Sequence, residues 1–247
     1  MKILFHIGRY IQMIFRMFYR PDNWRMYWQE LLRQINEIGV TSIPIVILIC
    51  GFIGAVTAVQ MSYQLVALDV IEVYYVSYIV RDSLLLELAP TFACLVLAGK
   101  VGSNLATELG TMRINDQIDA LEIMGVHSSS FLVLPKIIAA VLAVPALVVI
   151  GAAMGMAGGY LAGEISGLTD WFSYQKGLKY AITEYYFGIM FVKALVFSFI
   201  FSSIACYQGF YVKGGALEIG KNSTRAVVIS SIMILLADLV VVVAMTQ

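Results

Sequence analysis

The sequence predicts an all-α polytopic membrane protein: an N-terminal interfacial amphipathic helix, five transmembrane helices, and a cytoplasmic surface helix between spans two and three. Hydrophobic residues make up 60% of the 247 residues and charged residues 13%, about half the charged share of a typical soluble domain. Five apolar stretches are long enough to cross a bilayer, which takes roughly 20 such residues. The segment between the second and third stretches is too polar to span one.

The composition argues against several classes of function. The 16 basic and 16 acidic residues give a formal net charge of zero, which argues against a nucleic-acid partner. Cys50, Cys94 and Cys206 lie in apolar stretches without a CxxC pair, so neither a zinc site nor a disulfide framework is indicated. His6 and His127 lie in different regions and predict neither a metal centre nor a histidine-based triad. We therefore expect no metal and no cofactor.

Residues 1–36 differ from the rest of the chain because cations interrupt their apolar run. Lys2, Arg9 and Arg16 recur every seven residues, and apolar side chains fill the opposite side. This pattern is typical of a basic amphipathic helix that lies in the membrane interface without crossing it. A cleaved signal peptide is the alternative, and the arginines within the apolar run argue against it.

Residues 37–247 are predicted to form one transmembrane domain with no soluble domain beside it. The five spans are expected at about 40–63, 84–101, 134–162, 187–211 and 226–245. Pro145 lies inside the third span, which is long enough to tilt or kink.

The third span also carries four glycines at intervals of four residues, on one face of the helix: Gly151, Gly155, Gly159 and Gly163. Small residues at this spacing let two helix backbones approach closely. Three uses of this face remain open: packing within the chain, contact between protomers, or sliding during a conformational change.

The basic residues predict the orientation of the chain. Twelve of the 16 Lys and Arg residues lie in the N-terminal segment and in the loops after spans two and four. Short cytoplasmic loops carry such an excess of positive charge. With five spans, this bias places the N-terminus in the cytoplasm and the C-terminus outside it.

The polar segment at residues 104–124 keeps apolar residues at helical spacing, among them Leu105, Leu109 and Met112. Its acidic residues outnumber its one arginine. The pattern indicates a short amphipathic helix lying across the membrane surface, and the alternative is a solvated connector.

Several motifs carry a resemblance to a known family: Glu87-Leu-Ala-Pro90, Ala98-Gly-Lys-Val-Gly-Ser103, Glu108-Leu-Gly-Thr-Met-Arg113, Gln117 and Ala120-Leu-Glu-Ile-Met124, followed by KALVF at 193–197, Gly209, Thr224-Arg225 and Asp238. Over residues 40–247 the chain resembles the MlaE/YrbE-type permeases, the membrane subunits of ABC transporters that move phospholipids between the inner and outer membranes. Leu86 and Ala89 depart from that family's pattern, which often has Arg and Gly at these places.

The resemblance implies an inner-membrane homodimer that is not itself an enzyme. It implies a separate ABC ATP-binding subunit on the cytoplasmic side and an MCE-domain lipid-binding protein on the outer side. It makes residues 104–124 a coupling helix, with the ATPase contact at Glu108, Arg113, Gln117, Asp119 and Glu122.

Three charged residues lie within or near apolar spans and are expected in the outer half of the bilayer: Glu87, Lys193 and Asp238. Intramembrane charge is costly and marks candidate functional sites. Lys193 could pair with Asp238, bind the phosphate of a lipid headgroup, or extend its side chain to the outer surface.

The sequence supports other functions less well. Residues 215–222 (GALEIGKN) approach a P-loop but end in Asn, where magnesium binding needs a hydroxyl, so ATP binding is not expected here. An ion-coupled secondary transporter could use Glu87, Lys193 and Asp238, yet the spans show no inverted repeat. An intramembrane hydrolase lacks a histidine in its spans, and a scaffold without transport stays open.

Overall fold

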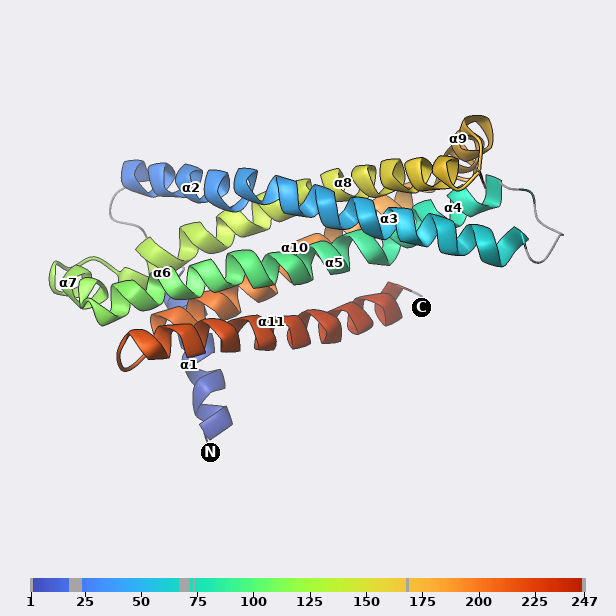
Figure 1. The fold of residues 1–247 in the computed structure, drawn as a ribbon. Coiled ribbons are helices and arrows are strands. Elements are labelled where there is room, and N and C mark those ends of the chain that lie inside the picture. The colour runs from blue at the N-terminus through green and yellow to red at the C-terminus, as the bar shows by residue number, and fades with distance from the viewer. Residues whose placement is uncertain (1, 18–23, 67–71, 73, 168, 246–247) are drawn as a thin grey trace. The chain divides into compact units, whose positions relative to one another are not determined.

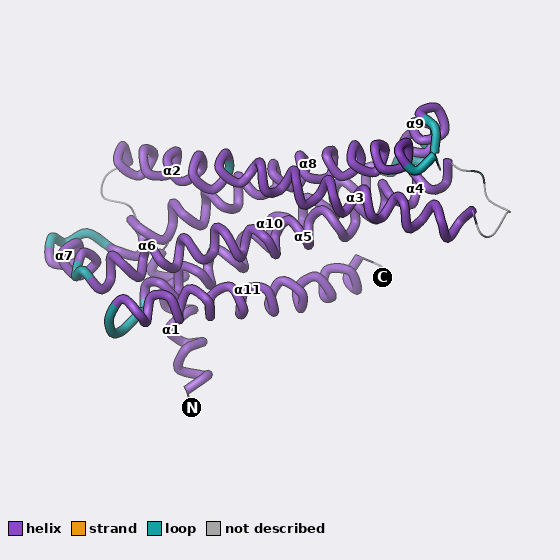
Figure 2. The backbone as a smooth tube through the Cα atoms, in the orientation of Figure 1, coloured by secondary structure: helices purple, strands orange, loops and turns teal. Residues whose placement is uncertain are grey.

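The computed structural model describes residues 2–17, 24–66, 72, 74–167 and 169–245. Every regular element within these ranges is helical, and none is a strand (Figure 2). Five of the described helices are long and apolar enough to cross a membrane: Arg25–Leu65, Tyr74–Ile114, Ser129–Ile165, Glu184–Phe210 and Ala216–Met245. The chain is therefore an all-α polytopic membrane protein. Residues 18–23 of the expected interfacial helix lie outside the described residues.

The elements can be followed along the chain by colour in Figure 1. Their order is α1 (Lys2–Met17), α2 (Trp24–Ile38), η1 (Val40–Ser42), α3 (Ile43–Val66), α4 (Tyr74–Ser83), η2 (Leu84–Leu88), α5 (Ala89–Leu97), η3 (Ala98–Gly102), α6 (Ser103–Ile114), α7 (Gln117–Ile123), η4 (Ser129–Val133), α8 (Leu134–Ile165), α9 (Trp171–Lys179), α10 (Glu184–Phe210) and α11 (Ala216–Met245).

The first two long helices extend well beyond the expected spans. The first comprises α2, the short helix η1 and α3. Pro44 is the second residue of α3, and it is tolerated there because a proline lacks only an N–H that has no helical partner in a first turn. The second runs from Tyr74 to Ile114 and contains the π-helical turns η2 and η3. η2 ends just before Pro90, which cannot donate the usual helical hydrogen bond. An apolar run alone does not reveal such polar extensions.

The single surface helix expected at 104–124 is two helices in the structure. Residues up to Ile114 continue the second long helix as α6, and only α7 is separate from it. The break falls at Asn115 and Asp116, and Asp116 has the left-handed backbone conformation (φ 55°). Asn and Asp tolerate such turns better than most residues, so this dipeptide interrupts the helix.

The chain divides into two compact units. The first unit comprises residues 1–41, 95–144 and 196–247, and the second comprises residues 42–94 and 145–195. In the first unit, α6 packs along α11, and α1 contacts η4. Two side-chain hydrogen bonds attach α1 to α10: Tyr10 Oη to Ser203 Oγ at 2.8 Å and His6 Nδ1 to Tyr207 Oη at 2.8 Å.

In the second unit, α4 packs against α3 and α9 (Figure 1). A close backbone approach joins α3 to α8. A Cβ added at Gly54 would lie 1.9 Å from the carbonyl oxygen of Gly155, and one added at Gly158 would lie 2.2 Å from that of Gly51.

The glycine face of α8 is filled from within the same unit. A Cβ at Gly151 would lie 2.8 Å from Cys50 Sγ, and one at Gly155 would lie 3.0 Å from a methyl of Leu84. Gly159 faces the Tyr174 hydroxyl and Gly163 the Thr169 hydroxyl. These contacts favour packing within the chain among the three uses considered for this face.

We expect Gly54→Ala to lower the free energy of unfolding by about 1–3 kcal/mol, the usual cost of overpacking a close contact. The added methyl would meet backbone, which cannot rotate away. Thermal unfolding of the purified protein in detergent measures the effect. Gly188→Ala is the matched control, because nothing lies within 4 Å of a Cβ there. Equal melting temperatures for the two variants would contradict the α3–α8 contact.

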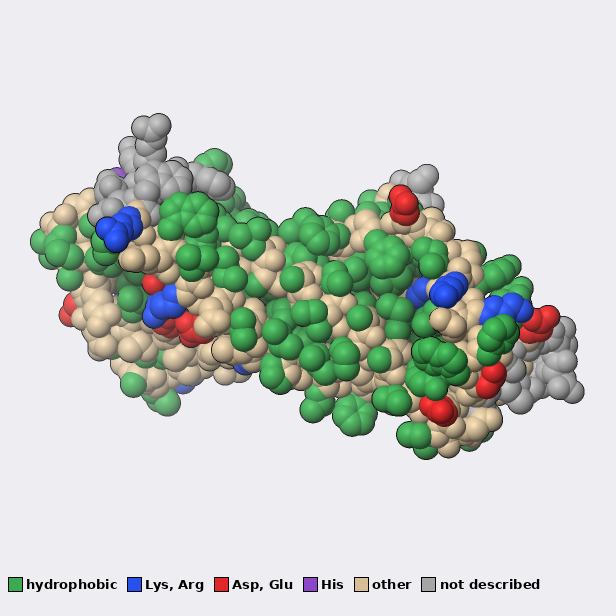
Figure 3. Space-filling model, turned by 90° about the horizontal axis from the view of Figure 1, so that it is seen from above, with side chains coloured by type: hydrophobic (Ala, Val, Ile, Leu, Met, Phe, Trp, Pro, Cys, Tyr) green, Lys and Arg blue, Asp and Glu red, His purple; other side chains and the backbone are tan. Residues whose placement is uncertain are grey.

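The surface of the protein suits a hydrocarbon environment. Figure 3 shows one face of the molecule, on which hydrophobic side chains predominate. Large exposed side chains include Phe52 and Val56 of α3 and Leu239 and Val240 of α11. Exposed apolar surface on this scale marks a membrane or protein contact.

Candidate functional site

The turn between α6 and α7 is held by an ion pair across it. Arg113 Nη1 at the end of α6 lies 2.6 Å from Asp119 Oδ1 of α7. Gly125, at φ 81°, follows the end of α7, where a left-handed glycine commonly terminates a helix. Two residues expected at the ATPase contact thus fix the turn between these helices.

One side of α7 is inserted into the first unit and the other is exposed. Ile118 is completely buried, whereas Ile123 is 87% exposed. Gln117, Ala120 and Met124 are also exposed. We call Gln117, Ala120, Ile123 and Met124 the α7 surface; its apolar side chains are of the kind that a partner protein covers.

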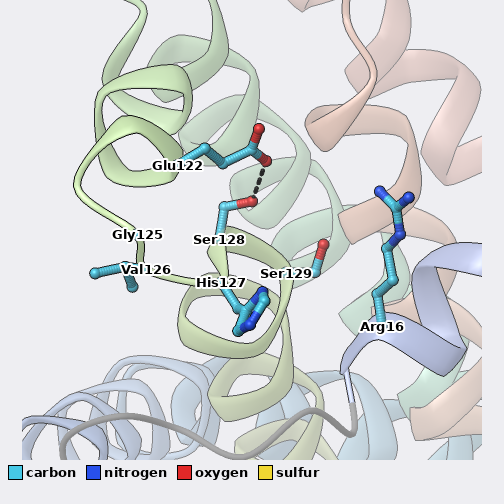
Figure 4. Close-up of a pocket in the computed structure, with 7 residues that line it drawn as sticks. All are labelled: Arg16, Glu122, Gly125, Val126, His127, Ser128 and Ser129. Carbon is cyan, nitrogen blue, oxygen red and sulfur yellow. Dashed lines mark hydrogen bonds between the residues drawn. The ribbon is translucent and has the colours of Figure 1, made fainter.

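Beneath α7 lies a cavity of about 500 Å³ whose wall includes residues of α1 and of the connection from α7 to η4. Figure 4 shows Glu122 on one side, Arg16 of α1 on another, and Ser128 between α7 and the start of the next helix. The Ser128 hydroxyl donates to Glu122 Oε1 at 2.6 Å. Glu122 therefore attaches α7 to the entry of the third long helix.

Glu108 does not share the α7 surface. Its carboxylate accepts a hydrogen bond from the buried Lys136 of α8 and lies 3.5 Å from Arg33 Nη2 of α2. Arg33 also pairs with Glu30 at 2.7 Å, and Glu30 accepts from Gln34 at 2.9 Å. We call Glu108, Lys136, Arg33 and Glu30 the Glu108 network; within the first unit it joins α2, α6 and the start of α8.

From the sequence, Lys136 counts only among the charges of the loop after span two, and Arg33 only among those of the N-terminal segment. The signal that could have revealed Lys136 is its position beside Pro135, at the start of a long apolar run. A lysine that is 1% exposed must be paired, because an isolated buried charge is far too costly.

In the second unit, Lys193 of α10 forms an ion pair with Glu87 of η2. Lys193 is 1% exposed, whereas the Glu87 side chain is 45% exposed. This ion pair joins α10 to η2, and the pairing of Lys193 with Asp238 considered from the sequence stays a prediction. Asp238 is a buried residue of α11 in the first unit.

Arg81, at the C-terminal end of α4, is a residue whose role the sequence does not reveal. Its guanidinium donates to the carbonyl oxygens of Leu178 (2.8 Å) and Tyr180 (2.7 Å) and pairs with Asp82 at 2.7 Å. It therefore caps the C-terminal end of α9, where the carbonyl groups have no helical partner. At the other end of α9, a hydrogen bond from Ser173 holds the pKa of Asp170 below its usual value.

We expect Arg81→Gln to lower the free energy of unfolding by about 3 kcal/mol, because several hydrogen bonds to one buried charge are lost together. Thermal unfolding in detergent, with limited proteolysis between α9 and α10, measures the change. Lys176→Gln is the control on α9 itself, since that lysine is exposed and its ion pair with Glu72 is 3.5 Å long. A variant as stable as this control would refute the cap.

The five long apolar helices define the class of the protein: it is an integral membrane protein. Its polar helices α6 and α7 add a surface suited to a second protein. Comparison with known proteins identifies the family. The model of the family described as Permease MlaE matches residues 31–244. The chain belongs to this MlaE permease family, and it is a permease component of an ABC transporter.

The relatives agree with this assignment. A probable ABC transporter permease protein of Rickettsia bellii is 40% identical over 220 residues, covering 86% of this chain and 82% of the relative. The intermembrane phospholipid transport system permease protein MlaE of Haemophilus influenzae is 30% identical over 240 residues, covering 95% and 89%. The chloroplastic protein TRIGALACTOSYLDIACYLGLYCEROL 1 of Arabidopsis thaliana is 29% identical over 217 residues, covering 87% and 61%.

Proposed function

We propose that this chain moves phospholipids between the inner and outer membranes and is powered by a separate ABC ATP-binding subunit. The observation that carries the coupling part is the α7 surface, an exposed and largely apolar patch; an ion pair attaches α7 to α6, and a hydrogen bond attaches it to the segment before η4. The phospholipid substrate is supported by the name of the Haemophilus influenzae relative, a phospholipid transport permease.

Coupling follows from the contacts of α6 and α7. The ATPase docks on the α7 surface, with Gln117 at its edge, and closure of the ATPase displaces the α6–α7 turn. The Glu108 network passes this displacement to α2 and α8, because its ion pairs join all three helices. In this account Arg113, Asp119 and Glu122 shape the docking surface, and Glu108 transmits the movement behind it.

The lipid path uses the Glu87–Lys193 pair. Lys193 exchanges its contact with Glu87 for the phosphate of a lipid headgroup, a charge-assisted bond of similar geometry. Glu87 is half-exposed, so the pair is reachable from outside the second unit.

The assembly follows the same reasoning. Two copies of the chain form a homodimer in the inner membrane, with the N-terminus cytoplasmic and the C-terminus periplasmic, as the distribution of basic residues favours. An MCE-domain lipid-binding protein takes the lipid on the outer side. Residues 1–36 lie in the membrane interface.

Purification in mild detergent tests the proposal. We expect a P-loop ATPase and phospholipid to be recovered with the chain, and vesicles containing both proteins to move fluorescent phospholipid only with ATP. Lipid movement by this chain alone, or movement driven by a membrane potential without any ATPase, would contradict the proposal and favour an ion-coupled transporter.

A further inference from the structure

A second polar cavity, separate from the residues proposed for coupling and transport, lies in the first unit. It has a volume of about 640 Å³ and is bounded by α1, the C-terminal end of α10 and the start of α11. None of the residues that line it belongs to the α7 surface, to the Glu108 network or to the Glu87–Lys193 pair.

The wall of this cavity is strongly basic. Arg9, Lys213 and Arg225 line it, together with one acid, Glu218. Lys221 Nζ lies 2.6 Å from Glu218 Oε1, so that carboxylate already has a cation of its own. The three lining cations therefore leave an excess of positive charge facing the cavity.

One of these cations, Arg9, is held by aromatic side chains. The Arg9 guanidinium lies over the ring of Tyr211, 5.0 Å from its centroid, and over that of Phe5 at 4.8 Å. Stacking of this kind orients a guanidinium without neutralising it. The neighbouring His6–Tyr207 hydrogen bond connects α1 to α10 at the same wall. The site is thus preorganised for an anion.

The same cavity has an apolar side. Ile7 of α1 and Ile229 of α11 line it and are both exposed. Each continues into an exposed apolar row, which includes Leu4 and Ile11 on α1 and Ile232 and Leu236 on α11. In a membrane protein, cations beside exposed apolar side chains mark the level of the lipid headgroups.

We propose that this cavity binds the headgroup of an anionic phospholipid, with phosphate against Arg9, Lys213 and Arg225 and acyl chains along Ile7 and Ile229. A free phosphate would match the cations but would leave the apolar side without a partner. A phospholipid matches both, as do basic pockets between transmembrane helices in general. The bound lipid is resident: it joins α1 to α10 and α11 and is not the transported molecule.

Native mass spectrometry of the full chain, purified in detergent with its bound partners, tests this site. Phosphatidylglycerol and phosphatidylcholine are added at equal concentration, and the retained lipid is counted. Each cation near a membrane surface contributes roughly a fivefold factor in affinity. We therefore expect Arg9→Gln/Arg225→Gln to lower phosphatidylglycerol retention by about 25-fold.

The control with the same charge change is Lys176→Gln/Lys179→Gln, on exposed residues of α9 in the second unit, which should retain phosphatidylglycerol fully. If Arg9→Gln/Arg225→Gln has a lower melting temperature than the unmodified chain, Lys213→Gln tests the site in its place, because that lysine is exposed in a short connection. We expect this variant to lower phosphatidylglycerol retention about fivefold.

Three results would overturn the site: equal retention of the two lipids, equal loss in the control variant, or full displacement of phosphatidylglycerol by millimolar inorganic phosphate. The last result would identify a free-phosphate site in place of a lipid site. Failure here leaves the proposed transport function standing, since that function is read from ATP-dependent lipid movement.

Discussion

Lys193→Met is expected to reduce ATP-driven phospholipid movement at least about tenfold while the chain remains folded and bound to its ATPase. Methionine keeps the length and apolar character of the buried stem but removes the ammonium that meets the phosphate. A hydrogen bond to a charged group contributes about 1.5–3 kcal/mol, which corresponds to at least a tenfold factor. Lipid movement in reconstituted vesicles measures the loss.

A double variant separates this function from a purely structural ion pair. Glu87→Gln/Lys193→Met removes both charges, so neither is left buried without its partner. If the pair only aligns η2 with α10, the double variant should regain transport. If Lys193 meets the headgroup, it should stay inactive, and Lys176→Met should transport normally. Recovery of transport in the double variant would contradict the role in the lipid path.

Glu108→Gln is expected to uncouple ATP hydrolysis from lipid movement. The substitution keeps the shape of the side chain but removes the charge that connects Lys136 of α8 and Arg33 of α2 to α6. The ATPase should still bind, because the α7 surface is unchanged, and hydrolysis should continue while transport falls. The uncompensated Lys136 should also lower the free energy of unfolding by about 3 kcal/mol.

Two further variants separate the effect of Glu108→Gln on coupling from its effect on stability. Glu108→Gln/Lys136→Met removes both charges, so stability should return while coupling stays impaired. Glu72→Gln removes an exposed carboxylate with a long ion pair and should change neither property. Normal transport by Glu108→Gln would contradict a transmitting role for the Glu108 network.

Much of the architecture follows from composition. Five apolar runs of bilayer length require helices, because lipid cannot hydrogen-bond the backbone. Polar flanks are harder to assign: the expected span at 84–101 is the centre of a helix running from Tyr74 to Ile114. Hydropathy marks where a helix meets lipid but not where the helix ends, and its ends depend on features such as the turn at Asp116.

Several site residues could be named from the sequence, but their contacts could not be predicted from it. Glu108 and Gln117 lie in one short segment, yet Glu108 faces Lys136 while Gln117 is exposed. The pair of Lys193 with Glu87 joins residues 106 positions apart, and no sequence spacing predicts it. The same holds for the carbonyl oxygens of Leu178 and Tyr180 that Arg81 binds, which lie almost 100 residues further along the chain.

Contact between the α7 surface and a nucleotide-hydrolysing protein in the cytoplasm is the central requirement of the proposed coupling. A photo-crosslinking amino acid at Ile123, in the intact complex in native membranes, tests it directly. Ile165 is the control position, because it is equally exposed at 87% but belongs to the second unit. We predict an adduct with an ABC-type ATPase from position 123 and none from position 165. An intact complex without that adduct, or labelling of Asp116→Cys only from the periplasm, would contradict the account.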